Sequence, residues 1–217
     1  MIYIVSGYRR SGTSMMMRAL ADGLQSGQVL YQPAQERIGN KREDGYIPNP
    51  SGLLEVGQQY YKNAVFLRKI PDNSVLKILY DGLANLPSGE YTIIFMTRRE
   101  CDILASCQKV DEHLRQVGVP ENRQKDRTFD VFRPYRQDDI DHVLGIVRQR
   151  KDMNLIEVRF EDVIADPESA FLCLSKRIPI NAELAAKVVN PSYYRFGNAN
   201  NEVSDAGASA QSEDSAD

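Results

Sequence analysis

A glycine-rich octet near the amino terminus constrains this chain more than any other feature. Residues 7–14 read Gly-Tyr-Arg-Arg-Ser-Gly-Thr-Ser, after an apolar run at 2–5 and before a helical pattern at 13–24. A strand, a glycine loop and a helix in this order form a cradle that binds phosphate-like anions. In nucleotide-triphosphate loops a Lys directly follows the second glycine, whereas here that position is Thr13. The sequence therefore predicts an anion site that differs from the terminal-phosphate site of ATP-binding loops.

Apolar runs rich in Ile, Val, Phe and Tyr alternate with longer helical patterns along most of the chain. We expect strands at residues 2–6, 75–79, 91–97 and 155–160, with a further short one at 29–31. We expect helices at residues 13–24, 53–63, 100–117, 138–151, 167–177 and 182–189. Strands with little polar alternation are typical of a parallel sheet covered on both faces. The pattern predicts a three-layer α/β fold with a central, mainly parallel sheet flanked by helices.

The composition favours one domain followed by an acidic tail. The chain has 217 residues, of which 42% are hydrophobic, enough for a single core. We assign residues 1–196 to this domain and expect the tail, 197–217, to be disordered. Residues 202–217 hold five acids and no Lys or Arg, so the rest has 27 basic against 25 acidic residues. So small an excess provides no basic stripe for a nucleic-acid backbone, and we exclude nucleic acid as the main partner.

Cysteine and histidine use indicates a cytoplasmic protein without a bound metal. Cys101, Cys107 and Cys173 are odd in number and show no CxxC spacing, which favours reduced thiols. We expect Cys107 and Cys173 to be small core residues. His113 and His142 lack the spacing of metal ligands. The first residues do not resemble a signal peptide, and no run approaches the roughly 18 apolar residues of a membrane span. We therefore expect a soluble, cytoplasmic protein.

The glycine loop offers donors of three kinds to an anion. Backbone N–H groups near Gly7 and residues 11–14 can converge on oxygen atoms, helped by the positive end of the following helix. Ser11, Thr13 and Ser14 add hydroxyl groups, and Arg10 adds a planar guanidinium that suits phosphate or sulfate. The alternative is an ordinary polar turn, which would not need so many donors in eight residues.

A second anion site is predicted around Arg98 and Ser106. Arg98 ends the strand expected at 91–97, and Ser106 lies eight residues later in the next helix. Both would lie at the carboxyl ends of parallel strands, where ligands bind in open α/β sheets. Two separate anion sites suit a ligand that is charged at both ends. The alternative is that Arg98 pairs with a surface acid and that Ser106 has no role in binding.

Three motifs, in order, are similar to those of the sulfotransferases. Residues 6–14 resemble that family's 5′-phosphosulfate loop, a basic residue followed by Ser-Gly-Thr-Ser/Thr. Arg98 and Ser106, with Asp102 between them, match its 3′-phosphate site in type and spacing. Residues 158–162 resemble its strand with an aromatic-Glu-Asp pattern. The resemblance spans about residues 3–177 and implies a P-loop-like fold, with 3′-phosphoadenosine 5′-phosphosulfate (PAPS) as sulfuryl donor, PAP as product, and no metal.

The resemblance also implies which residues bind the donor. By matched position, the 5′-phosphosulfate would be held by Arg10, Ser11, Gly12, Thr13 and Ser14. Arg98 and Ser106 would hold the 3′-phosphate, and Phe160 matches the aromatic position near the adenine. The alternative for Phe160 is core packing.

Lys77 is the one cation in an otherwise apolar run at 75–79. A buried ammonium is costly unless it is paired. In sulfotransferases a strand Lys at this place reaches the transferring group, so the resemblance implies that Lys77 and Arg10 are catalytic. The alternative is a Lys on an edge strand whose ammonium reaches solvent.

The general base is where the chain departs from part of the family. Cytosolic members carry a His two residues after the strand Lys, and here that position is Leu79. A carboxylate would then take the acceptor proton. Glu55 is the first candidate, because residues 49–55 resemble an Asn-Pro-x-Gly-aromatic-aromatic-Glu stretch of bacterial members. Glu36 is second and Asp81 is third.

The sequence indicates where an acceptor would bind. The polar connections at 33–50 and 118–135 would build its pocket, and we expect a hydroxyl or amine on a small molecule or glycan. Arg195 could close over the nucleotide from the carboxyl-terminal side. Two other functions stay open: a P-loop nucleotide kinase or NTPase, against which Thr13 argues, and a non-catalytic protein that binds PAP or PAPS.

Overall fold

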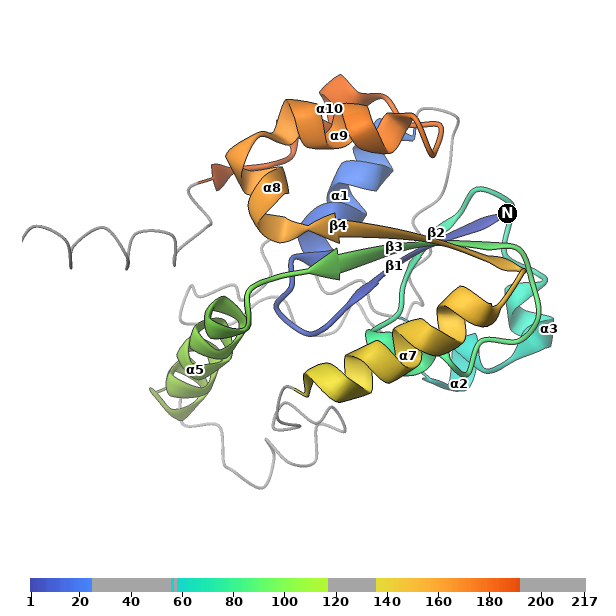
Figure 1. The fold of residues 1–217 in the computed structure, drawn as a ribbon, viewed down its shortest axis with the longest axis horizontal. Helices are drawn as coiled ribbons and strands as arrows, with labels where there is room; N and C mark the ends of the chain where they lie inside the picture. Colours follow the sequence, from blue (N-terminus) through green and yellow to red (C-terminus); the bar gives the residue numbers. More distant parts are fainter. Residues whose placement is uncertain (25–55, 57, 117–135, 192–217) are drawn as a thin grey trace, which may run out of the picture.

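Four parallel strands form the centre of the protein. The computed structural model describes residues 1–24, 56, 58–116 and 136–191. Within these ranges the strands are β1 (Ile2–Gly7), β2 (Val75–Lys77), β3 (Tyr91–Thr97) and β4 (Met153–Arg159). They form one sheet in the order β2-β1-β3-β4, with every neighbouring pair parallel (Figure 1). The predicted parallel sheet is therefore confirmed.

Helices cover both faces of this sheet. Four of them, α1 (Thr13–Gly23), α8 (Phe160–Ala165), α9 (Pro167–Ser175) and α10 (Ala182–Lys187), lie on one face (Figure 1). The opposite face carries α2 (Gln58–Tyr61), α3 (Ala64–Leu67), α4 (Tyr80–Leu83) and α7 (Gln137–Gln149). The helix after β3, α5 (Glu100–Gln116), packs on that same face through Ile103. The predicted α/β class with helices on both sides of the sheet is confirmed.

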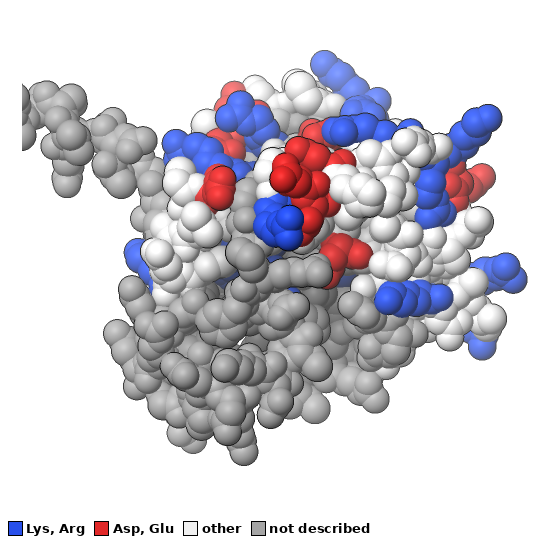
Figure 2. Space-filling model, turned by 60° about the horizontal axis from the view of Figure 1, so that its bottom comes forward, with Lys and Arg blue, Asp and Glu red and all other residues white. Residues whose placement is uncertain are grey.

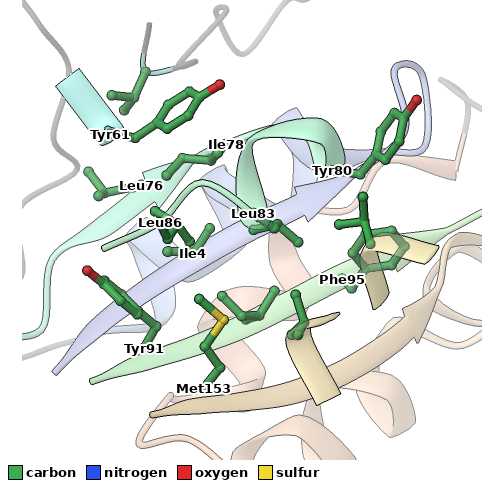
Figure 3. Close-up of a cluster of buried hydrophobic side chains, with 14 of the residues drawn as sticks. Ile4, Tyr61, Leu76, Ile78, Tyr80, Leu83, Leu86, Tyr91, Phe95 and Met153 are labelled. Carbon is green, nitrogen blue, oxygen red and sulfur yellow. The ribbon is translucent and has the colours of Figure 1, made fainter. Parts of the chain in front are cut away.

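The strand residues explain why both faces need a helical cover. Successive side chains point to opposite faces of a strand, so Ile4 packs in one apolar cluster and Val5 in the other. Figure 3 shows the first cluster, in which Ile4, Leu76 and Phe95 meet residues of the helices on that face. Every residue of β1 is buried. A strand without a polar side can lie only in the middle layer of such a fold.

Several predicted boundaries are wrong. The predicted strand 155–160 begins at Met153 instead and ends at Arg159, and Phe160 is the first residue of α8. In the predicted helix 53–63, the described residues are helical only in the single turn of α2. A separate turn, α3, follows, because the Asn63 side chain accepts hydrogen bonds from the N–H groups of Val65 and Phe66 and so starts a new helix.

The remaining predictions concern the burial of two cysteines and the structure of two further segments. Cys173 is exposed and Cys107 is only partly buried, so Cys173 is not the core residue that we expected. It lies on the outer side of α9, whose inner side is formed by Phe171 and Leu174. The predicted strand at 29–31 and the tail at 197–217 lie outside the described residues.

An ion pair joins two loops at the amino ends of the strands. Arg150 donates from Nε and Nη2 to the Asp152 carboxylate, at 3.0 and 2.6 Å. The same guanidinium donates to the carbonyl oxygens of Leu86 and Pro87, and Asp152 accepts from the N–H of Gly89. Because Arg150 hydrogen-bonds to it, the pKa of Asp152 lies well below its usual range. The pair thus fixes the turn before β4 against the loop before β3.

We expect Asp152→Asn to lower the free energy of unfolding at pH 7 by about 1–2 kcal/mol, since a partly exposed charged pair is lost. A lowered native pKa gives stability that is present above the unfolded pKa, about 3.9, and lost as the pH falls. The difference in the free energy of unfolding between wild type and variant should therefore shrink as the pH falls below about 5. Urea unfolding at a series of pH values measures it. Asp22→Asn, which removes an exposed pair with Arg18, is the control and should change little. A gap that stayed constant down to pH 2 would contradict this role.

Candidate functional site

The loop between β1 and α1 is held in an unusual backbone conformation. Gly7, Arg10 and Gly12 all have positive φ, at 145°, 65° and 94°. Both the N–H and the hydroxyl group of Ser11 donate to the carbonyl oxygen of Tyr8, at 3.2 and 2.6 Å. Ser11 is fully buried. Its hydroxyl group therefore closes the turn inside the loop. Its predicted role as a donor to a ligand stays a prediction.

Helix α1 begins without a side-chain cap. Gly12 is its N-cap residue and has no side chain that could accept a hydrogen bond. The first bond within the helix runs from the N–H of Met16 to the carbonyl oxygen of Gly12. The N–H groups of a helix's first turn have no carbonyl partner within the helix, and they carry its positive end. Thr13 and Ser14 thus bring backbone donors to the place where the sequence predicts an anion.

Close packing requires both loop glycines. A Cβ atom on Gly12 would lie 2.4 Å from Cδ2 of Phe160, and one on Gly7 would lie 2.5 Å from the carbonyl oxygen of Met96. Gly7 pairs with Met96 in the sheet, so the loop leaves β1 directly against β3. Glycine is therefore required at both positions, because each has a positive φ and neither has room for a Cβ atom.

Lys77 reaches this loop from the neighbouring strand. It is the last residue of β2, is 4% exposed, and donates from Nζ to Oγ of Ser14 at 3.1 Å. Its side chain points to the α1 face, because Val75 packs there and Leu76 packs on the other face. The ammonium group thus lies at the glycine loop and does not extend into solvent, contrary to the alternative considered for it.

Arg10, Arg98 and Ser106 form a second set of contacts beside the loop. Arg98, directly after β3, donates from Nη1 to the carbonyl oxygen of Arg10 at 2.7 Å. Arg10 donates from Nε to Oγ of Ser106 at 2.9 Å, although the two residues are 96 positions apart. Ser106 is 4% exposed in α5. These bonds bring together the residues of the two predicted anion sites.

The strand order accounts for this meeting point. The chain passes from β1 to α1 on one face and from β3 to α5 on the other. At such a switch point the two loops leave the sheet in opposite directions, and a crevice for ligands opens outside the carboxyl ends of the strands. Residues 8–12 and Arg98 lie at this position between β1 and β3.

Acidic residues next to Arg98 organise the turn that holds it. The side chain of Glu161 accepts from the N–H of Arg99 at 2.8 Å, and Arg99 forms an ion pair with Asp102 at 2.9 Å. Asp102 is 5% exposed. We did not predict these roles from the sequence. A signal was present for one of them, because Arg99 and Asp102 have the i,i+3 spacing of a helical ion pair.

Of the remaining predicted residues, the structure describes Phe160 and Asp81. Phe160 is 7% exposed and contacts Gly12 and Arg98, so its predicted place near an adenine stays a prediction. Asp81 is exposed in the first turn of α4. Glu55, Glu36 and Arg195 lie outside the described residues. The residue after Glu55, Val56, is described: it is buried, and its N–H donates to the carbonyl oxygen of Lys77 at 2.9 Å.

Three features of the described ranges bear on partners and cofactors: metal-ligating groups, membrane spans and surface charge. There, no group of three or more His, Cys, Asp or Glu side chains could hold a metal ion. No described helix has the length and hydropathy to cross a membrane. On the face drawn in Figure 2, Lys and Arg side chains are mixed with Asp and Glu. The prediction that nucleic acid is not a partner stays untested.

Comparisons with protein families and with curated proteins bear on the sulfotransferase assignment. No protein-family model matches the chain, and no curated protein matches it. The assignment to the sulfotransferases therefore rests on the motifs and remains a prediction.

We expect Gly12→Ala to lower the free energy of unfolding by about 1–3 kcal/mol, because Ala would be strained at this φ and would collide with Phe160. Gly145→Ala is the matched control. Gly145 lies inside α7, and nothing lies within 4 Å of a Cβ built there. This variant should raise the stability by about 0.4–1 kcal/mol. Thermal and urea unfolding measure both. Equal effects of the two substitutions would mean that Gly12 is not sterically required.

Proposed function

We propose that this protein is a sulfotransferase with a P-loop-like fold, which takes a sulfuryl group from PAPS and transfers it to a hydroxyl or amine of a small molecule or glycan. One observation supports this most. Cationic side chains from three separate segments, Lys77, Arg10 and Arg98, meet hydrogen-bonding partners in or beside one glycine loop. Two of the three motifs contain Arg10 and Arg98, and the resemblance separately implies a role for Lys77.

The donor set suits a ligand with an anion at each end. The first-turn N–H groups of α1, together with Arg10 and Lys77, can hold a phosphosulfate at the loop. Arg98 and Ser106 can hold a second phosphate on the β3 side. Their contacts with Arg10 keep the two subsites adjacent, as the 5′ and 3′ groups of one nucleotide require.

Sulfuryl transfer places particular demands on these residues. A base takes the acceptor's proton, a bond forms between the acceptor and sulfur, and the bond from sulfur to the bridging oxygen breaks. Negative charge then grows on that bridging oxygen. In the proposed complex Lys77 and Arg10 would stabilise this charge, and the burial of Lys77 would strengthen the interaction. The resemblance assigns the base to Glu55.

Two other functions share parts of this site. A P-loop kinase or NTPase would use the same strand, loop and helix, but Thr13 replaces the Lys that reaches terminal phosphates. A non-catalytic protein that binds PAP would keep the cationic cluster and lack a working base. A kinase or NTPase would differ from the proposed enzyme in the nucleotide that it binds. A non-catalytic protein would differ from it in showing no turnover. Ligand binding and turnover can both be measured.

We expect PAP to bind in the presence of EDTA and to raise the melting temperature of the wild type. Arg98→Ala should weaken PAP binding roughly 10- to 100-fold, since a charge-assisted contact is lost. Isothermal titration calorimetry measures the affinity, and circular dichroism checks the fold. The matched control is Arg148→Ala on α7, which removes only an exposed pair with Glu157. A wild type stabilised by Mg-ATP and not by PAP would instead identify a kinase or NTPase.

We expect Glu55→Gln to lower turnover at least about 100-fold while PAP affinity changes little, because a neutral amide cannot accept the acceptor's proton. Transfer of radiolabelled sulfate from PAPS to a panel of phenols, sugars and amines measures turnover. Asp81→Asn is the companion variant, since Asp81 is an exposed carboxylate near the end of β2. Loss of activity in Asp81→Asn alone would move the base to Asp81. A wild type that binds PAP and transfers nothing would support the non-catalytic alternative.

A further inference from the structure

We propose that Phe160 is a positioning residue that fixes Arg98 against the glycine loop, so that the two anion subsites select a nucleotide carrying phosphate at both its 3′ and 5′ positions. This inference rests on the proposed function. It gives Phe160 a task other than contact with the adenine. The ring would act through Arg98 and Gly12, and it would not touch the reacting atoms.

The first contact is between the ring and Arg98. The Cζ atom of Arg98 lies 4.4 Å from the centroid of the Phe160 ring, within the range of a cation–π interaction. The sheet register explains this closeness. Thr97 pairs with Arg159 in the parallel ladder of β3 and β4. These are the last residues of the two strands, so Arg98 and Phe160 are the residues that directly follow them. The pairing therefore places the ring beside the guanidinium group.

The second contact is between the ring and the loop. A Cβ atom at residue 12 would lie 2.4 and 2.9 Å from Cδ2 and Cε2 of Phe160. The ring thus fills the space that a side chain at Gly12 would need, and it supports the N-cap of α1. One rigid group therefore touches both the start of the anion-binding helix and the guanidinium of the second subsite.

The residue after Phe160 holds the same turn from its other side. Glu161 accepts from the N–H of Arg99, so consecutive residues of the β4–α8 corner bind consecutive residues of the β3–α5 turn. Arg98 is also held by the carbonyl oxygen of Arg10, to which its Nη1 donates. With its guanidinium fixed in advance, Arg98 loses less rotamer freedom when an anion binds. Truncating the ring would remove this preorganisation and leave the positive charge in place.

The test compares PAP with 5′-AMP, which lacks the 3′-phosphate. Phe160→Leu should weaken PAP binding roughly 3- to 30-fold, the range of a desolvated cation–π contact. It should weaken 5′-AMP binding less, so the preference for PAP over 5′-AMP falls. In an Arg98→Ala background, Phe160→Leu should change PAP affinity less than about twofold, because the group it positions is gone. Calorimetric titration of all four proteins measures the cycle.

Two variants separate positioning from general packing. Phe160→Tyr keeps the ring and should restore most of the PAP preference. Phe171→Leu makes the same change at a buried phenylalanine of α9 in the same apolar cluster, and it should leave the preference unchanged even if the melting temperature falls. Additive effects of Phe160→Leu and Arg98→Ala, or an unchanged PAP preference in Phe160→Leu, would overturn this inference. Neither result would affect the proposed function. A wild type that does not bind PAP would overturn the proposed function, and the inference with it.

Discussion

The parallel pairing of β1 with β3 is the constraint on which the candidate site depends. Its register runs from Ile2 with Tyr91 to Gly7 with Met96, so both strands end at the same level. The glycine loop and Arg98 therefore leave the sheet side by side. Gly7 is needed there because a side chain would strike the carbonyl oxygen of Met96. A slip of one residue in this register would turn every buried side chain of β1 to the opposite face and separate the loop from Arg98.

Much of the fold could be predicted because the central strands lack polar residues. The predicted strand at 91–97 matches β3 in both ends, since its apolar run stops at Thr97 and two arginines follow. The predicted end of β4 was wrong, because the apolar pattern continues past the last strand residue. Phe160 continues the apolar pattern, but the chain turns there into α8, and an apolar ring serves equally well as the last residue of a strand or the first of a buried helix.

The contacts within the site could be predicted only in part. The sequence indicated that Arg10 and Arg98 belong near one another, because a glycine loop and the ends of parallel strands share one edge of the sheet, and the family resemblance implied the same place for Lys77. It did not indicate that Arg10 bonds to Ser106 or that Ser11 turns its hydroxyl group inward to Tyr8. Those choices depend on side-chain rotamers and on a positive φ at Arg10, which residue type alone does not specify.

The positions of the cations around the loop account for Thr13, which stands where nucleotide-triphosphate loops have a Lys. Thr13 is 4% exposed at the first position of α1, and the cations at the loop come from other positions in the chain. Lys77 comes from β2 through Ser14, and Arg10 comes from within the loop. A Lys at residue 13 would start inside the helix and extend along a chain of terminal phosphates. Lys77 instead reaches the loop from the adjacent strand, at Ser14. In the proposed reaction it would lie beside the phosphosulfate bound at the loop. Negative charge would grow there, because the bond from sulfur to the bridging oxygen breaks next to that group.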